Sequence, residues 1–399
     1  MKKNAEIFII SLTLVSILFA CSPQQSQESP AATNLVGVTP TTTVSSLSDP
    51  ASSTSTPSTD TLDEISLPLS EPGPYFAGDR KYTFIDNSRN ERKIEIQIYY
   101  PALKEVNNNG TAITRDAAPD MSGAPYPLIF TGYNSGNNLY KSHLASYGFV
   151  MVIVHSPGFR YEDPWNNSVI DAPLDFLFVL DSLTAKSPEG LDGVLDTDRV
   201  GVAGYSSDGF FSLALGGARI NPEYYLSQCA KAPNMDPPMS AFLINYYCNL
   251  SERWDEFSSQ VGTKITTVTN GLWQPTTDDR ILAVMPMAPD SAWLYGPEGL
   301  AAINIPSMII AGTKDTGVSY KLTSCYVYDH LVNTDRFLIS FIGKHHMMVD
   351  EREVILRIRH FSVAFLGYYV QGRTEYADYF SDSFVSQFDD LYWGVYTGD

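Results

Sequence analysis

The sequence is poor in cysteine, in basic residues and in long apolar runs, and each shortage excludes a class of protein. Four cysteines in 399 residues are too few for a disulfide-dense miniprotein or a multi-finger zinc protein. Lys and Arg number 26 against 45 Asp and Glu, a net charge of −19, which argues against a nucleic-acid-binding protein because phosphates are neutralised by clustered basic residues. The hydrophobic content of 44% is too low for a polytopic membrane protein and too high for a chain that is disordered throughout. An acidic globular protein remains.

The first 21 residues have the features of a secretory signal. A lysine pair precedes an apolar run at 7–20, which has the length of a signal-peptide core and is too short to span a bilayer. This run ends in Leu-Phe-Ala-Cys21, which resembles a lipobox, the motif in which the cysteine thiol is lipidated and becomes the new N-terminus. A cleaved signal without lipid is the alternative. We expect 1–21 to be a lipoprotein signal peptide and Cys21 to anchor an extracytoplasmic protein to the cell membrane or the outer membrane.

A polar stretch separates this signal from the rest of the chain. Residues 22–61 contain 10 Ser, 9 Thr and 5 Pro, which is too little apolar surface to offset the entropy of ordering. We therefore predict a solvated, flexible tether over 22–74 that holds the body away from a membrane surface. A stalk with no binding role of its own is sufficient to explain it.

From residue 75 to 399 apolar strand-like runs alternate with helical patterns. Runs of strand length occur at 93–100, 127–131, 149–154, 199–203, 281–285, 306–311 and 336–342. Helical spacing occurs at 171–186, 207–218, 319–332 and 352–370. Continuous apolar strands are typical of a sheet covered on both faces, and strands that alternate with helices form βαβ units. The sequence predicts an α/β fold with a mostly parallel central sheet and helices on both faces.

The alternation breaks at 219–278, which is rich in Pro, Asn and Tyr. We interpret this segment as an inserted cap or lid over the carboxyl edge of the sheet. A surface excursion without contact to substrate is the alternative. The insertion carries Cys229 and Cys248, and an extracytoplasmic location permits a disulfide between them. Two buried thiols are the alternative to that bridge, and Cys325 would keep its thiol in the core.

The most specific motif is Arg-Val-Gly-Val-Ala-Gly-Tyr-Ser-Ser-Asp-Gly at 199–209. An apolar strand runs into a tight turn and a helical stretch follows at once, which is the context of a nucleophile elbow. An ordinary junction with incidental serines is the alternative. We predict Ser206 as the nucleophile rather than Ser207, because the position two residues before Ser207 is the bulky Tyr205.

The residues around this serine fit an elbow with one departure. Backbones crowd at such a turn, so small residues are needed two positions before and three positions after the nucleophile. Gly204 and Gly209 supply them. Asp208 replaces the second Gly of the common G-x-S-x-G pattern.

A serine nucleophile needs an acid and a base downstream, in that order. Asp315 follows the run at 306–311, and Asp290 follows the run at 281–285 beyond a proline that ends the strand. The adjacent His345 and His346 follow the last strand-like run. The coincidence of acids and histidines at consecutive strand ends predicts a catalytic triad, although spacing alone does not choose between the two histidines.

The body resembles a known family over roughly 80–370. The α/β-hydrolases that include platelet-activating-factor acetylhydrolase, dienelactone-hydrolase-like esterases and cutinase-like polyester hydrolases are similar in five places. These are the 127–154 block with Leu-Ala-Ser-Tyr-Gly-Phe-Val, the elbow, the Asp-Arg-Ile…Met-Ala-Pro segment at 279–289, the Ile-Pro…Gly-Thr-Lys-Asp segment at 305–315, and the helix at 359–365. The resemblance implies an α/β-hydrolase fold with a cap-like insertion.

The resemblance also implies roles for individual residues. Relatives favour Asp315 as the acid and Asp290 as its alternative, and they favour His346 as the base with His345 as its alternative. By the same resemblance, the backbone N–H groups of Tyr133 and Ser207 form the oxyanion hole. The Asp208 substitution, the long insertion and a missing His-Gly pair depart from the family's pattern.

These features together predict a lipid-anchored, extracytoplasmic serine esterase. Its substrate would be a small-molecule or lipid ester, with short-chain lipid, phospholipid acetyl or related esters first. An apolar acyl or aromatic group is suggested by aromatic residues of the insertion, namely Tyr224, Tyr225, Phe242, Tyr246 and Tyr247. No spacing of His, Cys or acidic residues indicates a metal site and no P-loop lysine is present, so we expect no cofactor. A catalytically inactive binding lipoprotein is one alternative, and peptidase or lactonase chemistry on the same triad is another.

Overall fold

The computed structural model describes residues 66–104, 113–135, 140, 142–158, 168–236, 238–290 and 292–398. The predicted signal peptide, the lipidation site Cys21 and most of the predicted tether lie outside these residues. In the part described, no helix is long and apolar enough to cross a bilayer. All of it belongs to the unit that begins at Glu64.

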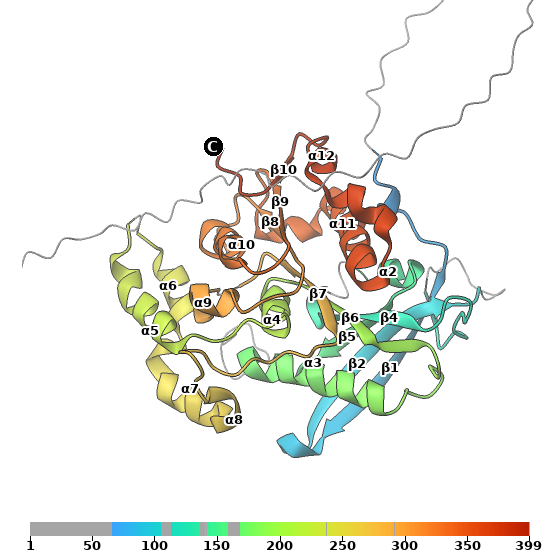
Figure 1. The fold of residues 1–399 in the computed structure, drawn as a ribbon, viewed down its shortest axis with the longest axis horizontal. Helices are drawn as coiled ribbons and strands as arrows, with labels where there is room; N and C mark the ends of the chain where they lie inside the picture. Colours follow the sequence, from blue (N-terminus) through green and yellow to red (C-terminus); the bar gives the residue numbers. More distant parts are fainter. Residues whose placement is uncertain are drawn as a thin grey trace, which may run out of the picture. The chain divides into compact units, whose positions relative to one another are not determined.

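Within the described ranges, ten strands form one mixed sheet in the order β10-β9-β8-β7-β6-β4-β5-β2-β1-β3 (Figure 1). The strands from β4 to β9 run parallel to their neighbours, whereas β2 is antiparallel to β5 and to β1, and β10 is antiparallel to β9. This arrangement confirms the predicted α/β class with a mostly parallel sheet. The strands are β1 (Phe76–Asp86), β2 (Arg92–Ala102), β3 (Ile113–Arg115), β4 (Tyr126–Gly132), β5 (Val150–His155), β6 (Leu195–Tyr205), β7 (Ile281–Met287), β8 (Ser307–Gly312), β9 (Arg336–Phe341) and β10 (Leu391–Trp393).

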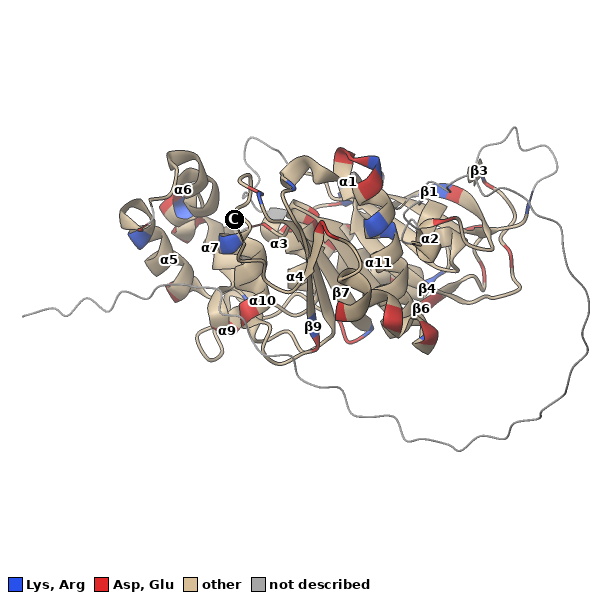
Figure 2. Ribbon diagram, turned by 90° about the horizontal axis from the view of Figure 1, so that it is seen from above, with Lys and Arg blue, Asp and Glu red and all other residues tan. Residues whose placement is uncertain are grey.

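Helices cover both faces of this sheet because its strands carry apolar side chains on both. Along β5, Met151 and Ile153 pack in one cluster with α2 and α11, whereas Val152 and Val154 pack in another cluster with α3. Strands β4, β5, β7 and β8 contain no Lys, Arg, Asp or Glu, and Figure 2 shows many of these residues on the helices and loops around the sheet. The α-helices are α1 (Tyr133–Ser135), α2 (Ser142–Ser146), α3 (Ser168–Ala185), α4 (Ser207–Leu215), α5 (Pro222–Lys231), α6 (Ala241–Cys248), α7 (Trp254–Val261), α8 (Thr263–Thr266), α9 (Gly296–Leu300), α10 (Tyr326–His330), α11 (Arg352–Gln371) and α12 (Asp382–Val385). Short 3-10 or π turns are η1 (Pro68–Ser70), η2 (Asn87–Arg89), η4 (Ala232–Asn234), η5 (Ser251–Arg253), η6 (Ala292–Leu294), η7 (Lys321–Cys325), η8 (His346–Asp350) and η9 (Thr374–Phe380).

The order of the strands reverses at β4, which has β5 on one side and β6 on the other. The chain passes from β4 to β5 on one side of β4 and then returns through α3 to β6 on the other side. In open α/β sheets, ligands bind outside the carboxyl ends of the strands at such a reversal. The ends of β4 and β6 therefore mark the place where a site is expected.

The folded body begins earlier than the sequence predicted. Leu69 in η1 is buried, its N–H donates to His360 Nδ1 at 3.2 Å, and its carbonyl accepts from His143 Nε2 at 2.9 Å. Residues 66–74, which the sequence assigns to the end of the tether, are thus part of the body. An apolar residue and two histidines far away in sequence fix it there, which a local pattern could not reveal.

The insertion at 219–278 folds into α5 to α8 and two short turns. Its apolar side chains pack in one cluster with those of α4 and η6. A disulfide joins Cys229 in α5 to Cys248 at the end of α6, as the sequence predicted, and the buried Cys325 forms no disulfide in the described chain. The insertion is therefore anchored to the helix that follows Ser206.

Candidate active site

Ser206 lies in a strained turn between β6 and α4. Its backbone has φ 61° and ψ −120°, a conformation that costs a non-glycine residue on the order of 1–3 kcal/mol and is found at functional sites. A side chain on Gly204 would approach the Asp208 carbonyl to 2.4 Å, and one on Gly209 would approach the Met287 carbonyl to 2.7 Å. The predicted need for small residues on both sides of the turn is confirmed.

Asp315 and His346 reach this serine from the loops that follow β8 and β9. The hydroxyl of Ser206 lies 3.0 Å from His346 Nε2, and His346 Nδ1 lies 2.7 Å from Asp315 Oδ2. The second oxygen of Asp315 accepts from the Gly317 and Val318 N–H groups at 2.9 and 3.1 Å. The carboxylate thus holds the imidazole with its proton on Nδ1 and its lone pair on Nε2, facing the serine.

The surroundings of His346 favour its charged form despite partial burial. Burial by itself lowers the pKa of the imidazole, but the hydrogen bond from His346 to Asp315 and the charge of that carboxylate outweigh it, so the pKa is raised. The side chain of Asp315 is 1% exposed and that of His346 is 22% exposed. A base that water can reach and a buried acid that orients it are the arrangement that proton transfer from Ser206 requires.

Asp208, the departure from the common elbow pattern, is held by hydrogen bonds beneath the turn. Its Oδ2 accepts from the Ser135 hydroxyl at 2.6 Å and from the Ser135 N–H at 3.2 Å, and burial raises the pKa of the carboxyl. The Ser135 hydroxyl also accepts from the Tyr205 N–H at 2.8 Å. A side chain on Gly132 would approach Asp208 Oδ1 to 1.9 Å. Asp208 therefore links the first turn of α4 to Ser135 in α1, and His346 takes part in neither hydrogen bond.

The alternative acid and the alternative base have other partners. Asp290 Oδ2 accepts from the Ser207 hydroxyl at 3.1 Å and from the Tyr246 hydroxyl at 2.9 Å. His345 Nδ1 lies 2.7 Å from the Lys314 carbonyl, and its side chain is exposed. The structure therefore brings Ser206, Asp315 and His346 together and joins Asp290 and His345 to other groups.

The two residues predicted to donate to an oxyanion flank the serine. Tyr133 follows the last residue of β4, and Ser207 is the first residue of α4. The Tyr133 side chain is 51% exposed, and its ring packs against His155 with the ring centroids 4.2 Å apart. No sequence pattern connects His155 with this region, because the pattern shows only that it lies at the end of a strand.

Two tyrosines of α6, which sequence reasoning treated only as aromatic lining, contact the loops that follow β7 and β8. Tyr246 reaches Asp290, and the buried Tyr247 donates to the Val318 carbonyl in the loop of Asp315. Tyr225, also expected as lining, is buried with its hydroxyl on the Tyr247 carbonyl at 2.9 Å. Of these three tyrosines, Tyr225 and Tyr247 are core residues.

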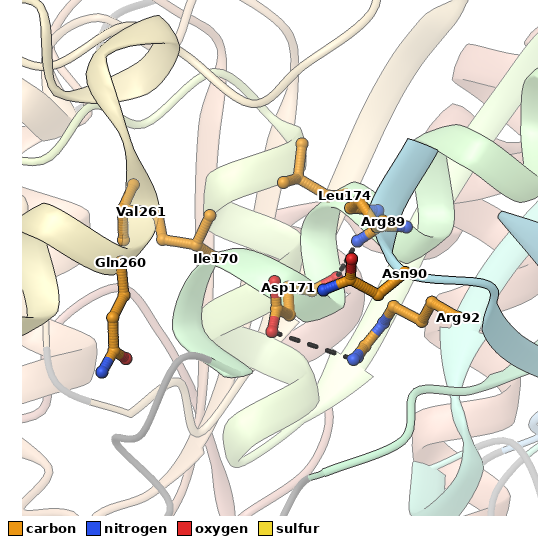
Figure 3. Close-up of a pocket in the computed structure, with 8 residues that line it drawn as sticks. All are labelled: Arg89, Asn90, Arg92, Ile170, Asp171, Leu174, Gln260 and Val261. Atoms are coloured by element: carbon orange, nitrogen blue, oxygen red, sulfur yellow. Dashed lines mark hydrogen bonds and ion pairs between the residues drawn. The ribbon is translucent and has the colours of Figure 1, made fainter. Parts of the chain in front are cut away.

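A cavity of about 330 Å³ lies elsewhere, between η2, β2, α3 and α7 (Figure 3). Arg89 and Arg92 line it, and both form ion pairs with the fully buried Asp175 at 2.7 and 2.8 Å. Arg92 also faces Asp171 at 3.8 Å. Because carboxylates already pair with both guanidinium groups, the cavity gives no indication of an anionic ligand.

Among the described residues, no group of three or more His, Cys, Asp or Glu side chains is arranged to hold a metal ion. Comparison with protein-family models found no match to this chain, and comparison with curated proteins found none either. The geometry of the site is therefore the basis for inferring a function.

Proposed function

We propose that the protein is a lipid-anchored, extracytoplasmic serine esterase with an α/β-hydrolase fold. The observation that carries this proposal is the hydrogen-bonded series Ser206, His346 and Asp315, with the serine in a strained strand-to-helix turn. A structural serine has no need of positive φ, and a structural histidine has no need of a buried carboxylate behind it. The arrangement is the one that activates a serine hydroxyl.

The topology supports the family assignment. In the family the nucleophile comes first along the chain, then the acid, then the histidine. Here they follow β6, β8 and β9, and the serine lies beside the β4 end, where the order of the strands reverses. With β3 as an added short strand at the edge of the sheet, Tyr133 and Asp315 follow the third and seventh strands of the family's order.

The proposed reaction begins when an ester carbonyl lies above Ser206. The serine oxygen attacks the carbonyl carbon while His346 Nε2 takes the hydroxyl proton, and the carbonyl electron pair moves onto its oxygen. His346 then gives this proton to the leaving alkoxide, and the acyl group stays on Ser206. A water molecule then attacks the acyl carbonyl carbon while His346 takes its proton. The bond from this carbon to the Ser206 oxygen breaks, His346 returns the proton to that oxygen, and the carboxylic acid leaves. Asp315 holds the imidazole in one orientation throughout.

The oxyanion that forms in each step requires preorganised donors. The N–H groups of Tyr133 and Ser207 are the donors that we propose, because they belong to the residues on either side of the nucleophile at the β4 and β6 ends. Removing one such donor from a serine hydrolase lowers kcat by on the order of 10²–10³. The Tyr133 ring, which is half exposed, would line the acyl side.

We propose short-chain lipid esters as the first substrate class. The net charge of −19 disfavours strongly anionic substrates. Three exposed apolar side chains belong to segments that contribute to the site: Tyr133 directly after β4, Phe242 on α6, the helix of Tyr246, and Met347 next to His346. The predicted Cys21 anchor would keep the body near lipid.

A fluorophosphonate probe and a chain-length series of p-nitrophenyl esters test this proposal on the soluble body. We expect Ser206 to be labelled, and we expect hydrolysis that is lost in Ser206→Ala and fastest for short acyl chains. An inactive binding lipoprotein is the second candidate, and Asp208 in the elbow is the observation that favours it. Absence of both labelling and hydrolysis in folded protein would leave only that candidate. Faster turnover of peptides or lactones than of open esters would favour the peptidase or lactonase alternative.

A further inference from the structure

The peptide group between Ser206 and Ser207 is held from two sides. Its carbonyl accepts from the Phe210 N–H at 3.1 Å and from the Asp290 N–H at 3.4 Å. Its N–H, on Ser207, is one of the two oxyanion donors proposed above. Because a peptide group is planar and its C=O and N–H point in opposite directions, restraining the carbonyl also restrains the direction of the N–H.

Asp290 holds this region a second time through its side chain. The Ser207 hydroxyl donates to Asp290 Oδ2 at 3.1 Å, so Asp290, in the loop after β7, contacts both the carbonyl of this peptide group and the side chain of Ser207. The Ser206 N–H donates to the Met287 carbonyl at 2.9 Å in the same strand end. The end of β7, the strand next to β6, thus fixes the elbow through backbone and side-chain contacts.

The insertion joins the same contact. Tyr246 of α6 donates to Asp290 Oδ2 at 2.9 Å, and Tyr247 beside it holds the Val318 carbonyl in the acid loop. The disulfide at Cys248 and the Tyr225 hydroxyl fix this end of α6. Two neighbouring residues of one helix therefore contact the elbow support and the loop of the triad acid.

A buried carboxyl is an expensive means of holding a turn. Asp290 is 0% exposed, its Oδ1 has no hydrogen-bond partner within the described ranges, and burial raises its pKa to about 6. The Tyr246 hydroxyl, the His346 charge and the Ser207 hydroxyl lower this pKa, while the charge of Asp315 raises it. Leaving a buried polar group unsatisfied costs about 1–3 kcal/mol, so its presence beside the nucleophile calls for a reason.

We propose that Asp290 is a positioning residue that fixes the Ser207 N–H for the oxyanion, and that Tyr246 makes the insertion part of this support. The proposal rests on the proposed esterase function and adds to it a role for the insertion in catalysis. Asp290 would touch neither the substrate nor His346. Its removal should weaken binding of the tetrahedral species more than binding of the ester.

The test compares kcat and KM for p-nitrophenyl acetate with the inhibition constant of a short alkyl trifluoromethyl ketone. When Ser206 adds to this ketone, its oxygen bonds to the carbonyl carbon, its proton goes to His346, and the ketone oxygen becomes an oxyanion. Asp290→Ala should lower kcat by about tenfold or more, with KM little changed, by comparison with loss of a whole donor. The inhibition constant should rise by the same factor. Asp290→Asn keeps an oxygen acceptor for both hydroxyls and should recover most of the loss.

Asp79→Ala is the matched control, because Asp79 is also a buried carboxylate with a side-chain donor, Gln97 at 2.9 Å, and it lies on β1. It should leave kcat and the inhibition constant unchanged. If Asp290→Ala does not fold, Ser207→Ala and Tyr246→Phe carry the test, each with a smaller parallel change in both quantities.

Two failures are distinguishable. A wild-type protein that neither hydrolyses the ester nor binds the ketone would overturn the esterase function, and the positioning role with it. An active wild type, an inactive Ser206→Ala and a folded Asp290→Ala with wild-type kcat and inhibition constant would overturn the positioning role alone. Wild-type values in both Ser207→Ala and Tyr246→Phe would do the same.

Discussion

Replacing Asp315 by Asn is the sharpest test of the proposed triad. The Asp315 carboxylate accepts from His346 Nδ1 at 2.7 Å, so the lone pair on Nε2 faces Ser206. An asparagine amide can instead donate to Nδ1, which places the imidazole proton on Nε2 and removes the acceptor for the serine proton. In serine proteases this substitution lowers kcat by about 10⁴. At 1.36 kcal/mol for each factor of ten, we expect about 5 kcal/mol of added barrier.

Asp290→Asn is the matched comparison, because Asp290 is the other acid at a strand end near the serine. It has no hydrogen bond to His346 in the structure, so we expect it to keep at least about a tenth of the activity, within the range of a misplaced oxyanion donor. The assay is steady-state hydrolysis of p-nitrophenyl acetate, with circular dichroism and thermal unfolding to verify folding. A 10⁴-fold loss in Asp290→Asn beside an active Asp315→Asn would refute the assignment.

The same pair of variants predicts a change in pH dependence. A base must be neutral, so kcat/KM should rise with pH through the raised pKa of His346. Asp315 and Asp290 both raise that pKa, and Asp315 contributes more. The acid limb of the profile should therefore move to lower pH in Asp290→Asn. An unchanged acid limb would contradict the electrostatic coupling.

Three further predictions concern the base, the cysteines and the buried histidines. His346→Ala should lower kcat as far as Ser206→Ala does, and the double mutant should be no worse than either single mutant. His345→Ala should keep most of the activity. An inactive but folded His345→Ala beside an active His346→Ala would reverse the assignment. Alkylation of the denatured soluble body without reductant should modify only Cys325, whereas three modified thiols would rule out the Cys229–Cys248 bridge. In the chain-entropy model, a disulfide that closes a loop of this length stabilises the folded state by roughly 3 kcal/mol. Burial lowers the pKa of His143 to about 4 and that of His360 to about 3, so protons bind the unfolded chain first as pH falls. The contribution of His143 to the free energy of unfolding should therefore be fully present above about pH 6.5 and should fall by about 3 kcal/mol as the pH approaches 4. Urea unfolding at a series of pH values should show this loss, and His143→Gln should reduce it.

The local pattern of the sequence was enough to place the central strands and the elbow. All seven predicted strands occur. Six are apolar runs, as expected for strands buried on both faces, and the run at 93–100 alternates apolar and polar residues, as expected for a half-buried strand. Gly204 and Gly209 identified the turn, since only small residues fit where backbones approach each other. The outer strands β1, β3 and β10 were missed, because β1 lacks a continuous apolar run and β3 and β10 are only three residues long.

The contacts between distant segments depended on the tertiary structure. Asp315 and Asp290 both follow a strand in the sequence, and only the folded chain shows that Asp315 faces His346 while Asp290 faces Ser207 and Tyr246. The sequence likewise could not choose between His345 and His346 without a resemblance. The direction in which a loop side chain points is set by backbone torsions and by neighbours far along the chain. The spacing of residues in the local sequence carries no information about either. The spacing of apolar residues and of glycines therefore determined the elements and the turn that carries Ser206, and the packing of the loops and the insertion determined which groups meet this serine.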